Sequence, residues 1–179
     1  MSLSDEFLKN LVNHLDTKKD YLQVWIDLRA KCEGWLKGEI LYVLKNKMDS
    51  SIKEFDCERK YKENNRCDIF FKSGEKEFWI EMKTVPTNYC PNFNEYGRSK
   101  LIGVDQIRTD MEKILKIKSD TKIPLVLLLV YPFPDGDIGH KKWQDKHLKK
   151  IKESPHSEIK KEVISINNGL YAFLYLFSF

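Results

Sequence analysis

The sequence predicts a single α/β domain in which helices flank a central mixed β-sheet. Three observations lead to this prediction. The chain has 179 residues, of which 41% are hydrophobic and 32% charged, enough apolar material for one packed core. The period of the apolar residues is helical near the start of the chain and then changes to that of strands. The wholly apolar stretch PLVLLLVYPF (124–133) is typical of a strand that is covered on both faces.

Helical stretches open the chain. Four apolar residues recur at helical spacing near its start: Leu3, Phe7, Leu11 and Leu15. They predict a helix over residues 3–16, capped by Ser4. A second helical stretch is expected over roughly residues 21–47, where apolar residues again line one side. Gly34 and Gly38 fall inside this stretch and lower its helical propensity, so its continuity is left open.

Three segments rich in β-branched and aromatic residues come next and predict strands. They are SIKEFDCERKY (51–61), RCDIFF (66–71) and EFWIEMKTV (77–85). The sequence KSGEKE joins the last two as a hairpin turn with Gly74 at its tip. Residues 86–100 are rich in Pro, Asn, Tyr and Gly, which predicts a long loop, and loops of this length are often functional.

The rest of the chain alternates between helix and strand. An amphipathic helix is expected over residues 103–117, the apolar strand over 124–133 and a basic helix over 141–154. KEVISI (161–166) and LYAFLYLFSF (170–179) predict a closing hairpin, because Asn-Asn-Gly separates them. We find no internal repeat and no linker in this order of elements, so one domain is expected.

Composition limits the classes of function. The formal net charge of +4 is a mild basic excess, which permits a polyanionic partner without requiring one. The four cysteines have no CxxC spacing, so neither a disulfide framework nor a zinc knuckle is indicated. The N-terminus lacks an apolar signal core, and the longest apolar runs reach roughly half of a membrane span. A cytoplasmic protein without a membrane segment is expected.

The predicted hairpin brings charged residues together within an apolar strand. With Gly74 and Glu75 at the turn, one face carries only apolar pairs: Phe71 with Phe78, Ile69 with Ile80, and Cys67 with Met82. The other face pairs Asp68 with Glu81 and also carries Lys83. Facing carboxylates destabilise a sheet unless a cation lies between them, and such oxygens suit Mg²⁺. The alternative is a polar hairpin face that is simply solvated.

These residues resemble the motif of the PD-(D/E)XK nuclease superfamily, which has the restriction-endonuclease-like fold. The likeness lies in RCDIFF, which contains Asp68, followed after a hairpin turn by WIEMKT, which contains Glu81 and Lys83. It covers roughly residues 32–133, and the order of elements is similar to the family's αβββαβ core. Residues 1–179 would form one such domain, with 3–16 and 141–179 as additions to the core. Cys67 stands where the family has the proline that names the motif.

The resemblance implies a metal site and a chemistry. Asp68, Glu81 and the backbone carbonyl of Met82 would hold Mg²⁺, for which Mn²⁺ can substitute. Lys83 would orient the attacking water and stabilise the charge that develops on the phosphate. Many members add a glutamate from the first core helix; we prefer Glu39, because GEILYVL resembles the family's glutamate with its aliphatic run, and Glu33 remains the alternative.

Other residues have weaker support. Gln106 resembles the glutamine that RecB-type nucleases carry on the helix after the active strand, whereas an ordinary helix glutamine is the other interpretation. Asp110, on the same helix, is expected to face solvent. In the loop after the catalytic strand, Tyr89, Arg98 and Lys100 mix aromatic and basic groups, as nucleic-acid surfaces do, and are the candidates for substrate contact.

The resulting expectation is a Mg²⁺-dependent nuclease that hydrolyses phosphodiester bonds, with DNA as the expected partner. One alternative is a catalytically inactive member of the same fold that binds nucleic acid or a protein. Another is an α/β protein whose polar hairpin face is only solvated. Many nucleases of this fold dimerise to cut two strands, so a homodimer is left open.

Overall fold

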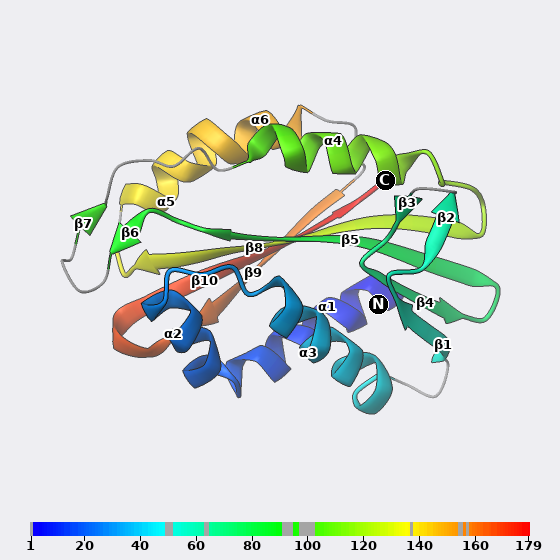
Figure 1. Cartoon of the computed structure of the whole chain (residues 1–179), viewed down its shortest axis with the longest axis horizontal. Coiled ribbons are helices and arrows are strands. Elements are labelled where there is room, and N and C mark those ends of the chain that lie inside the picture. Colours follow the sequence, from blue (N-terminus) through cyan, green and yellow to red (C-terminus); the bar gives the residue numbers. More distant parts are fainter. Residues whose placement is uncertain are drawn as a thin grey trace.

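A mixed sheet runs through the centre of the molecule (Figure 1). The computed structural model describes residues 2–48, 52–62, 65–90, 95–96, 103–136, 138–153, 156 and 158–179. Within these ranges six strands make up the sheet, in the order β1 (Ile52–Cys57), β4 (Ile69–Ser73), β5 (Lys76–Pro86), β8 (Lys122–Pro134), β10 (Leu170–Ser178) and β9 (Glu158–Ser165). β5 and β8 are parallel, and the other neighbours are antiparallel. The predicted single α/β domain with a mixed sheet is confirmed.

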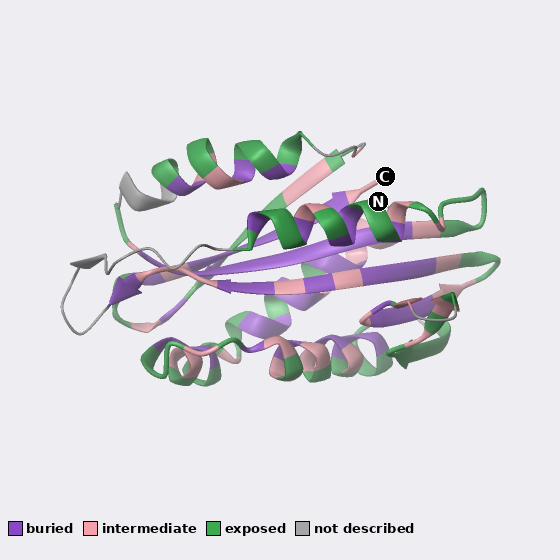
Figure 2. Ribbon diagram, turned by 45° about the horizontal axis from the view of Figure 1, so that its top comes forward, coloured by how far each residue is buried: buried purple, intermediate pink, exposed green. Residues whose placement is uncertain are grey.

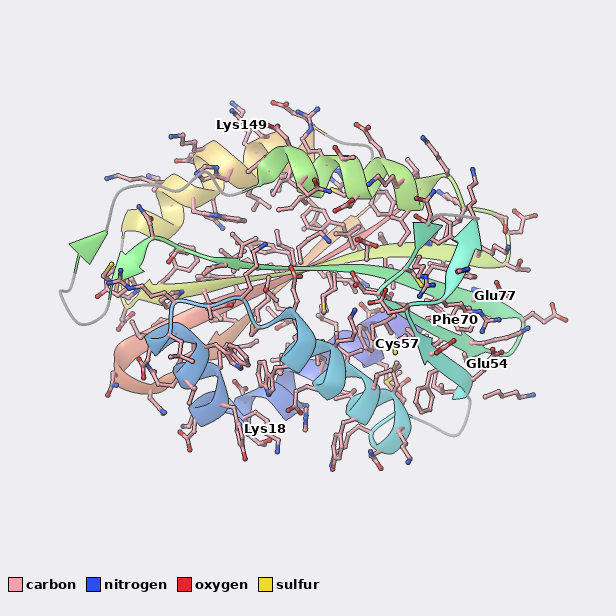
Figure 3. All side chains as sticks on the ribbon, in the orientation of Figure 1. Lys18, Glu54, Cys57, Phe70, Glu77 and Lys149 are labelled. Atoms are coloured by element: carbon pink, nitrogen blue, oxygen red, sulfur yellow. The ribbon has the colours of Figure 1, made fainter. Side chains whose placement is uncertain are left out.

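Helices cover both faces of this sheet. On one face lie α1 (Leu3–Asp16), α2 (Lys19–Asp27) and α3 (Glu33–Asn46) (Figures 1 and 2). On the other face lie α4 (Val104–Leu115), α5 (Ile138–Trp143) and α6 (Lys149–Lys152), with a π-helical turn at Gln144–Leu148 between the last two. Lys149 projects outward from α6, away from the sheet (Figure 3).

Short elements complete the described chain. Two-stranded ribbons pair β2 (Lys60–Lys62) with β3 (Asn65–Arg66), and β6 (Tyr89–Cys90) with β7 (Glu95–Tyr96). The 3-10 turn Asn167–Gly169 joins β9 to β10 and confirms the closing hairpin. None of the helices in the described ranges is both long and apolar enough to cross a membrane.

Each face of the sheet packs a separate hydrophobic core. The apolar run in β8 supplies both, because alternate side chains of a strand point to opposite faces. Leu125, Leu127 and Leu129 belong to the core beneath α1–α3. The intervening residues of β8, 126, 128 and 130, belong to the core beneath α4–α6. The strand is therefore covered on both faces, as its sequence predicted (Figure 2).

The N-terminal helices differ from the prediction in two details. Ser2, not Ser4, caps α1, and its hydroxyl accepts a hydrogen bond from the Asp5 amide in a capping box. The helix expected over 21–47 is two helices, because Arg29 adopts a positive φ of 51° after α2 ends. The hydroxyl of Tyr131 holds the intervening segment by donating to the carbonyl of Ala30 at 2.8 Å. The two glycines that made continuity doubtful lie inside α3.

The predicted register of the β4–β5 hairpin is confirmed over its inner part and wrong at its outer end. Ile69 pairs with Ile80, and Phe71 with Phe78, as expected. The ladder stops there, and Cys67 packs in the core beneath α4 rather than on the face of Met82. The cause is the inserted β2–β3 ribbon: the Cys67 amide donates to the carbonyl of Arg59, which draws this residue away from β5.

Truncation of Phe71 is expected to lower the free energy of unfolding by about 3–5 kcal/mol. Its side chain has no exposed surface and stacks on Phe78 with ring centroids 4.5 Å apart. The matched control is Phe55→Ala, since Phe55 lies opposite Phe71 on β1 but keeps 38% of its surface exposed. Urea denaturation of both variants checks the prediction, and equal losses at the two positions would contradict it.

Candidate functional site

The site begins where β5 extends beyond β4. The ladder between the two strands ends at Ile69 and Ile80, whereas β5 continues to Pro86. Beyond the end of the ladder, side-chain carboxylates accept hydrogen bonds from the backbone amides of β5. The Met82 amide donates to Asp68 Oδ2 at 2.8 Å, and the Thr84 amide donates to Glu33 Oε1 at 3.3 Å. Two carboxylates from different elements thus line the edge of β5 that β4 leaves open.

Met82 also brings a carbonyl oxygen to this edge. In an extended strand the amide and the carbonyl of one residue point to the same side. Because the Met82 amide points at Asp68, its carbonyl oxygen points to the same side of β5. The edge therefore presents both side-chain and backbone oxygens.

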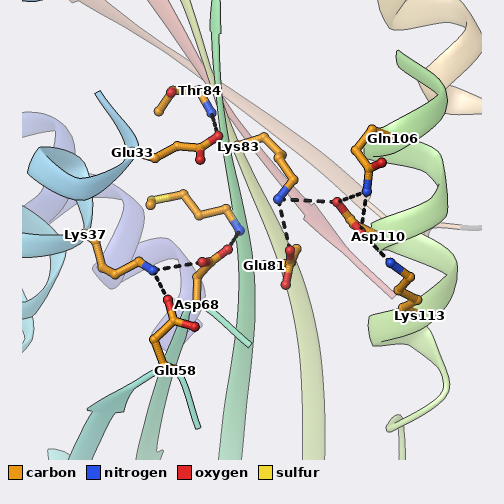
Figure 4. Close-up of polar contacts among 11 residues, drawn as sticks. Glu33, Lys37, Glu58, Asp68, Glu81, Lys83, Thr84, Gln106, Asp110 and Lys113 are labelled. Atoms are coloured by element: carbon orange, nitrogen blue, oxygen red, sulfur yellow. Dashed lines mark hydrogen bonds and ion pairs between the residues drawn. The ribbon is translucent and has the colours of Figure 1, made fainter. Parts of the chain in front are cut away.

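A cation from α3 contacts Asp68. Lys37 lies one turn after Glu33, and its ammonium is 3.0 Å from Asp68 Oδ1. Lys37 also pairs with Glu58, which precedes the β2–β3 ribbon (Figure 4). The predicted pairing of Asp68 directly opposite Glu81 is therefore not observed: Asp68 bonds to the β5 backbone and to α3, since the ladder has already ended.

Lys83 connects Glu81 to α4. Lys83 Nζ is 3.0 Å from Glu81 Oε1 and 3.3 Å from Asp110 Oδ2 (Figure 4). Gln106 donates to both oxygens of Asp110 at 3.1 Å, and Lys113 is 3.1 Å from Asp110 Oδ1. A continuous polar chain thus runs from α4 through Lys83 to Glu81.

Burial and neighbouring charges shift the pKa values of this chain. Burial, and after it the negative charge of Asp68, raise the pKa of Glu81 to about 7, although Lys83 opposes the rise. Burial alone would lower the pKa of Lys83, but the carboxylates of Glu81, Asp110 and Asp68 outweigh it and hold this pKa above its usual range. Lys83 therefore keeps its positive charge, whereas Glu81 holds its proton more tightly than an exposed glutamate, mainly because it is buried.

Asp110 shows the opposite balance. Burial acts to raise the pKa of Asp110, but hydrogen bonds from Gln106 and Lys113, and the charge of Lys83, hold it below the usual value. Its carboxylate is thus ionised and fully engaged. The expectation that Asp110 faces solvent is wrong, because it is only 7% exposed. Its spacing, three residues after Ile107 and four before Ile114, places it on the buried side of the helix and was the signal that could have identified it.

A small cavity adjoins Glu81 and Asp110. Its volume is about 180 Å³, and it lies among the β2–β3 ribbon, β5 and α4. Its lining residues in the described part of the chain are polar: Tyr61, Asn65, Arg66, Glu81, Asp110 and Lys113. Sequence reasoning did not identify this cavity, because the ribbon and α4 are more than 35 residues apart in the chain.

The two glutamates of α3 have different surroundings. Glu33 reaches β5, as described above, whereas Glu39 turns toward α1 and lies 2.5 Å from His14 Nε2. His14 in turn stacks on Tyr42. Six helical residues correspond to a rotation of about 120°, so the two carboxylates cannot face the same neighbour. The structure thus brings the alternative, Glu33, and not the preferred Glu39, to the same edge of β5 as Asp68.

Gln106 and Tyr89 do not contact the edge of β5 directly. Gln106 contacts it only through Asp110. Tyr89 is 6% exposed and packs in the core beneath α1–α3, which does not favour a substrate contact. Arg98 and Lys100 lie outside the described residues.

The donor set suits a hard divalent cation, although the carboxylates do not converge on one point. Mg²⁺ prefers oxygen ligands, and Asp68, Glu81 and the Met82 carbonyl offer them. Burial, with a smaller effect of the Asp68 charge, raises the pKa of Glu81, and a bound cation would favour the ionised form of this carboxyl group. Among the described ranges, however, no three His, Cys, Asp or Glu side chains form a group that could hold a metal. Lys37 forms an ion pair with Asp68, and Lys83 with Glu81. Their ammonium groups would have to move aside for a cation to bind these carboxylates.

Comparison with known proteins adds no further evidence. No family model, no curated protein and no solved structure matches the chain. The function must therefore be argued from the residues and their geometry.

Proposed function

We propose that this protein is a Mg²⁺-dependent nuclease with a restriction-endonuclease-like core, acting on DNA. The order of elements supports the proposal: α3, β1, β4, β5, α4 and β8 follow one another as αβββαβ, apart from the inserted ribbons. Asp68 directly precedes β4, and Glu81 and Lys83 lie on β5. These are the positions at which the motif requires its acidic and basic residues.

One observation carries the proposal. The Asp68 carboxylate bonds to the backbone of β5 at Met82, which lies directly between Glu81 and Lys83 in the strand. Two carboxylates, a carbonyl and an ammonium therefore gather around three consecutive residues. Asp68, Glu81 and the Met82 carbonyl would hold Mg²⁺, and Glu33 would add a carboxylate beside them. Bound Mg²⁺ would supply Lewis-acid activation of the phosphate and an activated water molecule.

The protein's own contribution is charge and orientation. Lys83 is kept protonated. Asp110, whose Oδ2 is 3.3 Å from the Lys83 ammonium, holds this ammonium beside Glu81. A preorganised cation of this kind stabilises negative charge that develops on a phosphate in the transition state. Lys83 would also orient a water molecule for in-line attack. No covalent enzyme intermediate is required.

A cleavage assay with Asp68→Asn tests the proposal. The protein is incubated with single-stranded DNA, duplex DNA and RNA in Mg²⁺, in Mn²⁺ and in EDTA. We expect metal-dependent cleavage that falls about 100-fold or more in the variant, because asparagine keeps the shape but loses the charge that would hold the cation. Asp105→Asn, on the exposed side of α4, is the matched control. No cleavage of any substrate by the unaltered protein would overturn the proposal.

A non-catalytic role on the same fold is the second candidate. The observation in its favour is that Lys37 and Lys83 already neutralise Asp68 and Glu81. If these ion pairs are purely structural, the protein binds nucleic acid or a protein partner without cleavage. Metal-independent binding of DNA, with no cleavage in Mg²⁺ or Mn²⁺, would favour this candidate.

A further inference from the structure

The small cavity beside Glu81 has walls from three elements. Tyr61, Asn65 and Arg66 come from the β2–β3 ribbon, and Lys113 comes from α4 on the opposite side. Glu81 of β5 forms part of the lining, so the cavity opens directly against the proposed reacting groups. Its volume of about 180 Å³ is below the roughly 300–1,000 Å³ of pockets for drug-sized ligands, so it suits one small polar group.

The lining residues divide into engaged acceptors and available donors. Asp110 accepts from Gln106 and pairs with Lys83 and Lys113, and Glu81 pairs with Lys83. Both carboxylates of the lining are therefore already neutralised. The other four side chains carry hydrogen-bond donors, namely the hydroxyl of Tyr61, the amide of Asn65, the guanidinium of Arg66 and the ammonium of Lys113.

Two of these donors, Arg66 and Lys113, are positively charged. Arg66, Lys113 and Lys83 carry three positive charges against the two carboxylates of Glu81 and Asp110, so one positive charge remains unbalanced in this group. An ammonium has three donors, so Lys113 keeps donors free after its contact with Asp110 at 3.1 Å. Arginine and lysine are the side chains that bind phosphate oxygens most strongly, through charge-assisted hydrogen bonds.

We propose that this cavity binds a phosphodiester group of the substrate strand, adjacent to the group that is cut, with Lys113 and Arg66 as its main contacts. The inference rests on the proposed function, because it assigns the neighbouring phosphate of the same nucleic acid. The cavity lies next to Glu81. If the scissile phosphate of a strand lies at Glu81 and Lys83, the next phosphate of that strand would lie in the cavity, between the β2–β3 ribbon and α4. Tyr61 and Asn65 complete the donor set around it.

Binding and cleavage are measured separately to test this. Binding of a fluorescent single-stranded dodecamer of thymidylate is followed by anisotropy in EDTA, where no metal-dependent cleavage occurs, over a series of salt concentrations. Lys113→Ala and Arg66→Ala are each expected to flatten the slope of log affinity against log salt by about 0.7, the loss of one phosphate contact on a single strand. Lys113→Arg should restore the slope, since it keeps the charge. Lys118→Ala, exposed just after α4, should not change it.

Cleavage then separates binding from chemistry. In Mg²⁺ we expect the two alanine variants to raise KM about tenfold while kcat changes little, because the contact is made equally in the ground state and the transition state. The exposed positions of Arg66 and Lys113 make unfolding a poor explanation of any loss, and circular dichroism controls for it.

The outcomes distinguish this inference from the proposed function. A flattened slope without any cleavage would retain the phosphate subsite and overturn the nuclease. Unchanged slopes in both variants, or no binding of the oligonucleotide by the unaltered protein, would overturn the subsite even if cleavage is found. A loss of kcat with unchanged KM would also contradict it, since that result assigns these residues to the transition state alone.

Discussion

Lys83→Ala is expected to lower metal-dependent cleavage by about 100-fold or more, the usual effect of removing one preorganised electrostatic group from an active site. Lys83 is the cation that bonds to Glu81 at 3.0 Å and to Asp110 at 3.3 Å, and these carboxylates keep it charged. Because its side chain is only 22% exposed, bulk water cannot replace the missing charge effectively. Initial rates in Mg²⁺ at saturating DNA measure the effect on kcat.

Controls for Lys83 must separate catalysis from folding. Lys76→Ala removes an exposed lysine from the same strand and should leave the rate unchanged. Truncation of Lys83 also leaves Glu81 and Asp110 without their shared cation, so thermal unfolding is measured on the same sample. A variant that stays folded and cleaves at the normal rate would remove Lys83 from the proposed mechanism.

The second large effect is a difference between two glutamates of one helix. Glu33→Gln is expected to lower cleavage by about 10- to 100-fold, the usual effect of altering a group that supports metal ligands. Glutamine retains an oxygen that can accept from the Thr84 amide, so the local structure should survive while the charge is lost. Cleavage rates over a range of Mg²⁺ concentrations show whether the apparent metal affinity falls.

Glu39→Gln should give the opposite result. Its carboxylate contacts His14, which is 7% exposed, and not the site. We expect a loss of unfolding free energy of about 1–3 kcal/mol, because glutamine weakens the hydrogen bond between the residue 39 side chain and the largely buried ring of His14. Cleavage per folded molecule should be unchanged. A strong loss of cleavage in Glu39→Gln, with none in Glu33→Gln, would show that the site is built differently from our proposal.

Much of the architecture could be predicted from periodicity alone. The alternation of apolar residues in RCDIFF and EFWIEMKTV predicted which residues pair, and Ile69 does face Ile80. The prediction failed at Asp68 and Cys67, the two residues that lie just beyond the ladder. Pairing rules assume that both strands continue, and the short β2–β3 ribbon ends this one early. An insertion of this kind has too few residues to produce a clear period of its own.

The sequence by itself determined the mixed sheet, the strand that is covered on both faces, and the placement of Asp68, Glu81 and Lys83 along one hairpin. The hairpin depends on contacts between residues close in the chain, and the strands are recognised from their composition and their two-residue period. Only the tertiary structure decided that Glu33 rather than Glu39 reaches β5, and that Asp110 holds Lys83. Both choices depend on how a helix is rotated against the sheet. That rotation is set by the packing of distant elements, which no local pattern of residues encodes.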